Sequence, residues 1–483
     1  MKNTSMVDYD VIIVGGGISG LVCGCHLVKA GLKTIILEKN KNVGGYCTSF
    51  MRNGFNFDSC VCSLSGFGKD ENLYKFTSKI ELKNDLNLIR SEISDIILTK
   101  NYKVNFYYDI NKTILELQKI FPRQKHEIKN FLELIRDSSV ISLTRFRKFS
   151  FEQILDSYFT DQELKKIFST PIFGYSGVSC SHISALVAFV IYKDFILSGG
   201  YYPRGGIQNF SNMLGEKFKE LGGVLFTSSE VKQILIKDNK ANGVILNNGS
   251  LFYSKYTVAA CDYHEVFLKL VGEQYFSKER LEKIKNRDVS LSAFILYLGI
   301  NKPFSELVDL KSHIWYIPEK NDNFGKDLRK TLNLNIEYIG ITSSSLKNSA
   351  ESSGKLKKET LFLITNVPFI SKEFWNDDSK RILSDYLIKT AERVIPGLST
   401  FIDTKVIATP LTLLKWTSNY NGSAYGWANT VEQFGDPDFS EKTEINNLLL
   451  TGHWLNNGSG VNAVSNTSFR TAKLIIRKLT KKN

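Results

Sequence analysis

The sequence predicts an α/β fold, in which a doubly wound, Rossmann-like nucleotide-binding domain is interleaved with an α+β substrate domain. Three observations near the amino terminus lead to the first part of this prediction. Residues 10–14 form a short, mostly β-branched run, which is typical of a buried parallel strand. A helix-like segment, residues 21–30, follows a cluster of glycines. A second strand, residues 34–37, then ends in an acidic side chain, so the whole segment is predicted to be one βαβ unit.

The glycines between the first strand and the helix have the spacing G-x-G-x-x-G. Gly15 permits the tight turn, Gly17 lets the backbone approach a pyrophosphate, and Gly20 lets the helix pack closely on the strand. The amino terminus of the helix offers unpaired N–H groups and the positive end of its dipole to the phosphates. The candidate pyrophosphate site therefore comprises Gly15, Gly16, Gly17, Ile18, Ser19 and Gly20.

An acidic residue closes the unit. Glu38 lies eighteen residues after Gly20, at the end of the second strand, where a carboxylate can accept a hydrogen bond from a ribose hydroxyl. The same carboxylate would repel a 2′-phosphate, so NADP is excluded and FAD or NAD remains. Lys39, the next residue, is included in the candidate site.

Two further glycine-rich loops are placed to contact a cofactor. Gly44, Gly45 and Tyr46 follow the acid closely, and a Gly-Gly pair lets backbone approach a ligand. Near the carboxyl terminus, a glycine-rich turn over residues 452–460 leads into a helix over residues 461–479, which makes a second anion-binding helix terminus. No second G-x-G-x-x-G accompanies it, so a separate nicotinamide domain is not expected.

The pattern of elements divides the chain into alternating segments. Three segments are predicted to build the nucleotide-binding domain: 1–69, 201–274 and 441–483. Two segments are predicted to build the substrate domain: 70–200, with apolar residues at helical spacing, and 275–440. Within the last of these, residues 343–358 are rich in Ser, Lys and Asn and are predicted to be a mobile loop.

Aromatic side chains gather in the second substrate segment and just after it. They are candidates for lining a substrate cavity, and core packing is the alternative. These residues are Trp416, Tyr420, Tyr425, Trp427 and Trp454.

The charge of the chain favours an anionic partner. Lysine and arginine exceed aspartate and glutamate by 62 − 49 = 13, and the pI is near 9.1. Because no nucleic-acid-binding motif is present, an anionic membrane surface is the better partner. Residues 145–149 alternate basic and aromatic side chains, which suits a membrane interface, although a solvated helix end gives the same pattern.

Cysteine and histidine usage indicates neither disulfides nor a metal site. The seven cysteines are odd in number and contain no C-x-x-C pair, which favours reduced thiols in a cytoplasmic protein. The first strand begins too early to leave room for a signal peptide. The most apolar stretch, residues 183–192, is too short to span a membrane, so the protein is expected to be soluble or membrane-associated at most.

Four blocks of the chain resemble the phytoene-desaturase-like family of FAD enzymes, within the amine-oxidase-like flavoprotein superfamily. That family includes carotenoid desaturases, carotenoid isomerases and retinol saturases. The blocks are residues 10–20 with Glu38, 43–58, 202–260 and 449–473. The resemblance covers about half of the chain, and its opening and closing blocks are the specific ones.

The resemblance implies a role for each matching position. The loop from Gly15 to Gly20 would hold the pyrophosphate of FAD, Glu38 the adenosine ribose, and the backbone of Val231 the adenine. The residues implied around the flavin are Gly44, Gly45, Tyr46, Gly452, His453, Gly460, Val461 and Asn462. The last helix would then stabilise negative charge at the N1–C2=O edge of the reduced isoalloxazine.

The sequence departs from the family pattern at three places. Tyr46 replaces the arginine of the usual Gly-Gly-Arg, Cys60 stands where a glycine is frequent, and Phe469 replaces the glycine of Ser-Gly-Arg. These departures concern the substrate and the direction of the reaction rather than the cofactor.

The resemblance therefore implies an FAD-dependent oxidoreductase or isomerase acting on carbon–carbon bonds of a lipophilic polyene, by hydride exchange with flavin N5. Such chemistry needs few acid–base side chains, and no nucleophile–base constellation is present in the sequence. One alternative is an amine or amino-acid oxidase of the same superfamily. Another is a non-enzymatic binding protein of the GDP-dissociation-inhibitor type. The choice among desaturation, isomerisation and saturation, the electron acceptor, the catalytic residues and the oligomeric state stay open.

Overall fold

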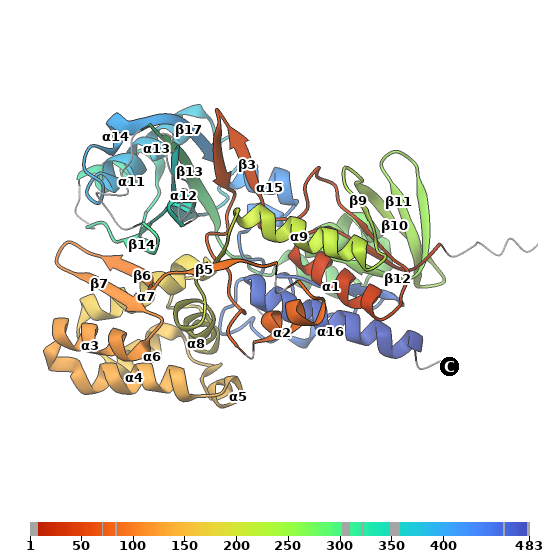
Figure 1. The fold of residues 1–483 in the computed structure, drawn as a ribbon, viewed down its shortest axis with the longest axis horizontal. Helices are drawn as coiled ribbons and strands as arrows, with labels where there is room; N and C mark the ends of the chain where they lie inside the picture. The colour runs from red at the N-terminus through yellow and green to blue at the C-terminus, as the bar shows by residue number, and fades with distance from the viewer. Residues whose placement is uncertain are drawn as a thin grey trace, which may run out of the picture.

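The computed structural model describes residues 8–69, 71–82, 85–301, 310–319, 323–347, 358–456 and 459–480. Two seven-stranded sheets organise these residues. The nucleotide-binding sheet lies at the right of Figure 1, and the substrate-domain sheet with its helices lies at the left. The chain crosses between the two regions several times, so both domains are built from segments far apart in the sequence.

The nucleotide-binding sheet takes strands from the beginning, the middle and the end of the chain. Its strands are β1 (Tyr9–Val14), β2 (Thr34–Leu37), β9 (Val224–Phe226), β10 (Val231–Lys237), β11 (Lys240–Leu246), β12 (Leu251–Ala259) and β18 (Leu448–Leu450). Neighbouring strands β18, β12, β1, β2 and β9 are parallel, and β10 and β11 extend β12 as an antiparallel meander.

Helices cover both faces of this sheet. Val11 and Ile13 of β1 pack into a core with α1 (Ile18–Lys29), α9 (Ile207–Glu220) and α16 (Val461–Thr480). Ile12 and Val14 pack into a second core on the opposite face, with the π-helix η4 (Glu265–Gly272). Because successive residues of a strand point to opposite faces, this alternation means that the sheet is buried on both sides. The predicted doubly wound fold is confirmed.

The second sheet joins the two predicted substrate segments. In spatial order its strands are β17 (Ile402–Ala408), β13 (Ser292–Ile300), β16 (Glu359–Val367), β15 (Ile339–Thr342), β14 (His313–Tyr316), β6 (Ile93–Leu98) and β7 (Lys103–Tyr107). The parallel pairing of β14 with β6 connects the earlier segment to the later one. Two small antiparallel pairs complete the described strands: β3 (Ser49–Arg52) with β4 (Phe55–Asp58), and β5 (Leu88–Arg90) with β8 (Tyr201–Pro203).

The helices of the substrate domain form two groups (Figure 1). The lower group consists of α3 (Ile110–Ile120), α4 (Lys125–Asp137), α5 (Val140–Leu143), α6 (Phe151–Tyr158), α7 (Gln162–Ser176), α8 (Ala185–Ile191) and the π-helix η3 (Tyr192–Leu197). The others are α11 (Asn323–Leu332), α12 (Ser344–Lys347), α13 (Asp377–Ala391), α14 (Leu398–Phe401) and α15 (Pro410–Thr417). Two further helices lie outside these groups: α2 (Asn72–Lys79) beside α16, and α10 (Lys278–Lys285).

The predicted mobile loop at 343–358 falls partly outside the described residues, which stop at 347 and resume at 358. Its beginning is helical rather than irregular: Ser343 caps the turn of α12, and Ser345 ties that turn to β16. The Ser343 hydroxyl accepts a hydrogen bond from the Leu346 N–H, and the Ser345 hydroxyl accepts one from the Thr360 N–H of β16. The described part of the loop is therefore fastened to the second sheet.

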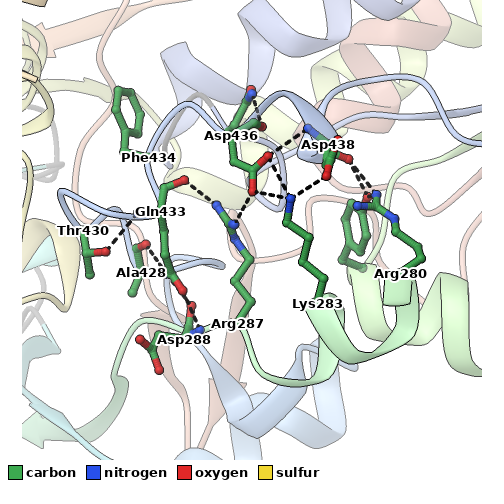
Figure 2. Close-up of polar contacts among 12 residues, drawn as sticks. Arg280, Lys283, Arg287, Asp288, Ala428, Thr430, Gln433, Phe434, Asp436 and Asp438 are labelled. Atoms are coloured by element: carbon green, nitrogen blue, oxygen red, sulfur yellow. Dashed lines mark hydrogen bonds and ion pairs between the residues drawn. The ribbon is translucent and has the colours of Figure 1, made fainter. Parts of the chain in front are cut away.

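A charged network ties α10 to the segment that returns to β18 (Figure 2). Lys283 forms ion pairs with Asp436, at 3.1 Å, and with Asp438. Arg287, just after α10, pairs with Asp436 at 3.1 Å, and its guanidinium lies 3.9 Å from the centre of the Phe439 ring. Since the Arg287 side chain is only 7% exposed, removing Asp436 would leave a buried charge unpaired and would cost more than breaking a surface ion pair. The network cross-links two segments that are more than a hundred residues apart.

Candidate active site

A cavity of about 280 Å³ lies at the carboxyl ends of β1 and β2, where the nucleotide-binding sheet faces the substrate domain. Most of the residues singled out in the sequence line it. They are Gly15, Gly17, Ile18, Ser19, Glu38, Lys39, Gly44, Gly45, Tyr46, Val231, Trp416, Tyr425, His453, Gly460 and Val461. The fold thus brings the three glycine-rich loops to one place, although the first and the last are more than four hundred residues apart in the sequence.

The three motif glycines differ in the space that the structure leaves for a side chain. Gly15 has φ +106°, and a Cβ on it would lie 2.7 Å from the Ala260 carbonyl oxygen. A Cβ on Gly20 would lie 2.1 Å from the Gly15 carbonyl oxygen, so this glycine permits the close packing of α1. Around Gly17, by contrast, the nearest atom to such a Cβ is 4.0 Å away. The space beside Gly17 belongs to the cavity and can hold a phosphate against the amino terminus of α1.

Glu38 organises the loop as well as facing the cavity. Its carboxylate accepts hydrogen bonds from the Gly16 N–H at 2.7 Å and from the Asn40 N–H at 2.8 Å. The side chain is buried, and each oxygen retains a lone pair for a ribose hydroxyl. Gly16 does not line the cavity, because its N–H is turned to this carboxylate.

The second glycine loop is locked onto the first. The Gly44 N–H donates to the Gly16 carbonyl at 2.8 Å. Gly44 has φ +124°, and a Cβ there would lie 2.3 Å from the Cys47 carbonyl oxygen, so only glycine fits. Tyr46 then enters the cavity wall, and its hydroxyl donates to the Ser423 carbonyl at 2.8 Å. Burial raises the pKa of this phenol, so Tyr46 stays neutral.

The carboxyl-terminal loop supplies the far end of the cavity. Gly460, with φ +97°, and Val461 at the start of α16 both line it, and the first-turn N–H groups of the helix lie there. The Asn462 side chain is directed elsewhere: its amide donates to Asp194 at 3.0 Å. Burial raises the pKa of Asp194 to about 6. The predicted contact of Asn462 with a cofactor can therefore involve only its backbone.

His453 and Gly452 flank the same region. The His453 ring lines the cavity 6.2 Å from the ring of Tyr46, and burial lowers its pKa to about 4, so it is neutral at pH 7. Gly452 does not line the cavity. Its N–H donates to the Thr467 hydroxyl at 3.0 Å, and a Cβ on it would lie 3.2 Å from the Ser19 hydroxyl oxygen. It acts as a spacer between the first and the last loop.

The predicted aromatic lining needs correction. Trp427 and Trp454 are buried against one another, with ring centres 5.0 Å apart, and line neither of the cavities described here, so they pack a core. Trp416 does line the cavity, but at its opposite end: it is 58% exposed, and its carbonyl accepts a hydrogen bond from Asn40, beside Glu38. Tyr425 stands between the two cavities, where a substrate-lining residue is expected.

A second cavity, of about 150 Å³, adjoins the first at the α16 end. The residues that line both are Cys60, Val61, Ile364, Tyr425, Ser459, Gly460 and Val461. Beyond this shared wall the lining combines aromatic rings with ionisable groups, among them Asp95, Tyr175, His313, Trp315 and Lys347. None of these five was singled out in the sequence, since they come from four separate elements and form no motif.

Asp95 is the centre of the polar part of this second cavity. It is 1% exposed, and its Oδ1 accepts hydrogen bonds from the Tyr175 hydroxyl at 2.8 Å and from the Trp315 indole N–H at 2.7 Å. Burial raises the pKa of this carboxyl, and the two donors oppose the rise by stabilising the carboxylate. The His313 ring is tilted against the Trp315 ring with ring centres 4.2 Å apart, and burial lowers the pKa of His313 to about 3.

Comparison with known proteins decides what the first cavity holds. A family model described as flavin containing amine oxidoreductase matches residues 18–476. The chain belongs to this family.

Individual relatives of this flavin oxidoreductase are distant but cover nearly the whole chain. A prolycopene isomerase from an Oncidium hybrid is 25% identical over 95% of this chain and 82% of its own length. A 4,4′-diapophytoene desaturase from Methylomonas is 24% identical over 97% of this chain and 95% of its own. An oxidoreductase from Methanosarcina mazei has the same fold, with a TM-score of 0.68, 17% identity, and coverage of 96% of this chain and 100% of its own.

The cofactor of this flavin oxidoreductase is FAD, and the cavity fits it. Gly17 leaves room for a pyrophosphate, and Glu38 has lone pairs to spare for the adenosine ribose. The α16 terminus faces the far end of the cavity, where the flavin would lie. No group of three or more His, Cys, Asp or Glu side chains suited to a metal ion occurs among the described residues. None of the helices within the described ranges is long and apolar enough to cross a bilayer.

Glu38→Gln is expected to weaken FAD binding by roughly ten- to a hundredfold. The amide keeps the shape of the carboxylate but loses one or more charge-assisted hydrogen bonds, each worth about 1.5–3 kcal/mol. Fluorescence titration of the apoprotein with FAD measures the change. Glu230→Gln, which alters another glutamate lining the same cavity, serves as the control. Equal affinities of wild type and Glu38→Gln would mean that Glu38 only braces the loop.

Proposed function

We propose that this FAD-dependent oxidoreductase acts on carbon–carbon bonds of a lipophilic polyene, either oxidising, isomerising or reducing it. The observation that carries the proposal is the position of the second cavity. It opens from the α16 end of the first cavity, and aromatic rings make up much of its lining. The names of the relatives, an isomerase of prolycopene and a desaturase of diapophytoene, support the same substrate class.

Each part of the chain has a proposed task in this reaction. Segments 1–69, 201–274 and 441–483 hold the cofactor, and segments 70–200 and 275–440 hold the substrate. When bound, FAD supplies hydride acceptance and donation at its N5. The first turn of α16 stabilises negative charge on the flavin through its unpaired N–H groups. Val231, which lines the opposite end of the first cavity, contacts the adenine through its backbone.

The substrate domain positions the polyene and keeps water out. Phe195 stacks on Tyr175 with ring centres 5.2 Å apart, and Trp315 meets Tyr175 edge to face at 5.0 Å. These rings make a dry wall beside the shared boundary of the two cavities. Exclusion of water protects a reactive polyene from side reactions and strengthens the electrostatic effect of the helix terminus.

Anaerobic incubation of the holoprotein with a panel of polyenes tests the proposal. Products are identified by chromatography and mass spectrometry, with the flavin supplied oxidised in one series and reduced in the other. A desaturase bleaches the oxidised flavin, a saturase reoxidises the reduced flavin, and an isomerase changes double-bond geometry without net redox change. If amines or amino acids bleach the flavin and no polyene is altered, the protein is an oxidase of the amine type instead.

We further propose that this flavoprotein is cytoplasmic and attaches reversibly to an anionic membrane, where its substrate resides. Val140, Ile141 and Phe149 are among the exposed large apolar residues, at 52%, 83% and 48%. Arg145 and Lys148 lie between them in the sequence and are exposed as well. Apolar side chains beside basic ones suit the interface of an anionic bilayer.

Arg145→Glu combined with Lys148→Glu is expected to weaken binding to anionic liposomes at least about tenfold, since each basic residue near the surface contributes about 1 kcal/mol. Sedimentation with liposomes at several salt concentrations measures the effect, and FAD content should not change. Lys237→Glu with Lys240→Glu is the matched control, because it changes the charge equally at an exposed hairpin. Equal losses in both double variants would indicate attraction by net charge alone.

A further inference from the structure

The second cavity contains two ionisable groups whose hydrogen-bonding capacity is not used up: Asp95, which is buried, and Lys347, which is partly buried. Asp95 accepts hydrogen bonds from Tyr175 and Trp315 at Oδ1, and the Ser94 hydroxyl also interacts with its carboxylate, so about one of the four acceptor sites of the carboxylate stays open. Lys347, at the end of α12, lines the same cavity and makes one hydrogen bond to the described residues, from its ammonium to the Cys62 carbonyl at 2.9 Å. An ammonium has three donors, so two remain.

The Asp95 carboxylate and the Lys347 ammonium are not paired with each other directly. Asp95 and Lys347 feel one another electrostatically, but they form no direct ion pair in the described part of the chain. The side chain of His313, also in the wall, makes no hydrogen bond among the described residues, and its Nε2 is fully buried. Buried charges without close partners are costly, so a cavity of this kind is expected to hold something polar.

We propose that this cavity binds a hydroxyl group on the substrate, which donates to the Asp95 carboxylate and accepts from the Lys347 ammonium. The inference rests on the proposed function and narrows it, from polyenes in general to polyene alcohols. The hydroxyl end lies in the second cavity. The adjoining part of the polyene runs along Tyr425 and Gly460, which line both cavities. It thereby reaches the flavin end of the first cavity.

The two charges discriminate among end groups. A hydrocarbon end would expel water from both charges and leave them unpaired. A carboxylate would pair with Lys347 but be repelled by Asp95, and an amine would be repelled by Lys347. A carbonyl could accept a hydrogen bond from Lys347 but has no hydrogen to donate to Asp95. A hydroxyl, which is both donor and acceptor, fits both groups at once.

Affinity measurements on the FAD-loaded full chain test this inference. The probes are a conjugated polyene alcohol, the hydrocarbon of equal length in which methyl replaces the CH₂OH group, and the corresponding carboxylic acid. Dissociation constants come from the change in flavin absorbance on binding. Wild type is expected to bind the alcohol at least about tenfold more tightly than the hydrocarbon, and the acid more weakly than the alcohol.

Variants of the two charged residues should move this preference in different directions. Lys347→Met should remove most of the preference for the alcohol, and Lys347→Arg should restore part of it. Asp95→Asn should weaken binding of the alcohol and strengthen binding of the acid, because the negative charge that repels the carboxylate is gone. Lys358→Met is the matched control. Like Lys347, Lys358 donates a hydrogen bond to one backbone carbonyl, that of Asn53, and its ammonium lies over the Phe55 ring. It lines neither cavity.

The outcomes separate this inference from the proposed function. If wild type binds alcohol and hydrocarbon equally, the cavity holds only water and the inference is overturned, while conversion of the hydrocarbon would keep the proposed function. An unchanged preference in Lys347→Met and Asp95→Asn, with FAD still bound, also overturns it. If none of the three probes binds, both proposals fail.

Discussion

Gly17→Val is expected to give a folded protein that cannot bind FAD. The backbone of Gly17 has φ −68° and ψ 175°, which valine adopts without strain. A Cβ there meets no atom closer than 4.0 Å, so the side chain would project into the space reserved for the pyrophosphate. We expect at least a hundredfold loss of FAD affinity, with little change in the thermal stability of the apoprotein. Absorbance at 450 nm, calorimetry and reconstitution with excess FAD measure both effects.

Two other glycines provide the comparison that makes this result interpretable. Gly20→Ala places a Cβ 2.1 Å from a backbone oxygen, so it should lose the fold together with the cofactor. Gly325→Val lies in α11 of the substrate domain, where the nearest atom to a new Cβ is 3.7 Å away, and it should retain FAD. A Gly17→Val protein that purifies yellow at full occupancy would show that the pyrophosphate does not lie against this loop.

The nucleotide-binding half of the molecule was predictable because its signals are local. One motif of six residues, placed between a strand and a helix and followed by Glu38, is enough to predict the first parallel strands, the loop and a dinucleotide cofactor, either FAD or NAD. The family resemblance was needed to choose FAD. At Gly15 and Gly20 steric contacts leave no alternative to glycine. The same motif did not reveal that Glu38 also accepts two backbone N–H groups, since that depends on how the loop folds back on itself.

The substrate half was predictable only in outline. Its sheet depends on the pairing of β6 with β14, more than two hundred residues apart, and no local pattern encodes that register. The polar wall of the second cavity combines Asp95 from β6, His313 from β14 and Lys347 from α12. The aromatic residues were predicted wrongly for a related reason: residue type alone does not tell a cavity wall from a core. Trp427 and Trp454 are of a type that often lines cavities, but they are buried against one another.

Gly460 couples the flavin end of the first cavity to the second cavity, and Gly460→Ala is expected to disturb both. A Cβ on Gly460 would lie 2.5 Å from the tip of the Phe195 ring. Phe195 stacks on Tyr175, whose hydroxyl donates to Asp95. Displacement of Phe195 therefore reaches the polar end of the substrate cavity.

A double variant separates the two causes of this effect. Gly460→Ala should lower FAD affinity at least tenfold, partly by the contact with Phe195 and partly because φ +97° is unfavourable for any residue with a Cβ. Phe195→Leu alone should retain FAD, since the smaller side chain only removes packing. In the double variant the contact is relieved but the backbone strain, about 1–3 kcal/mol, remains. FAD affinity should therefore recover only in part. Full recovery would mean that the collision was the whole effect, and no recovery would mean that the backbone conformation of Gly460 alone holds the amino terminus of α16 against the flavin.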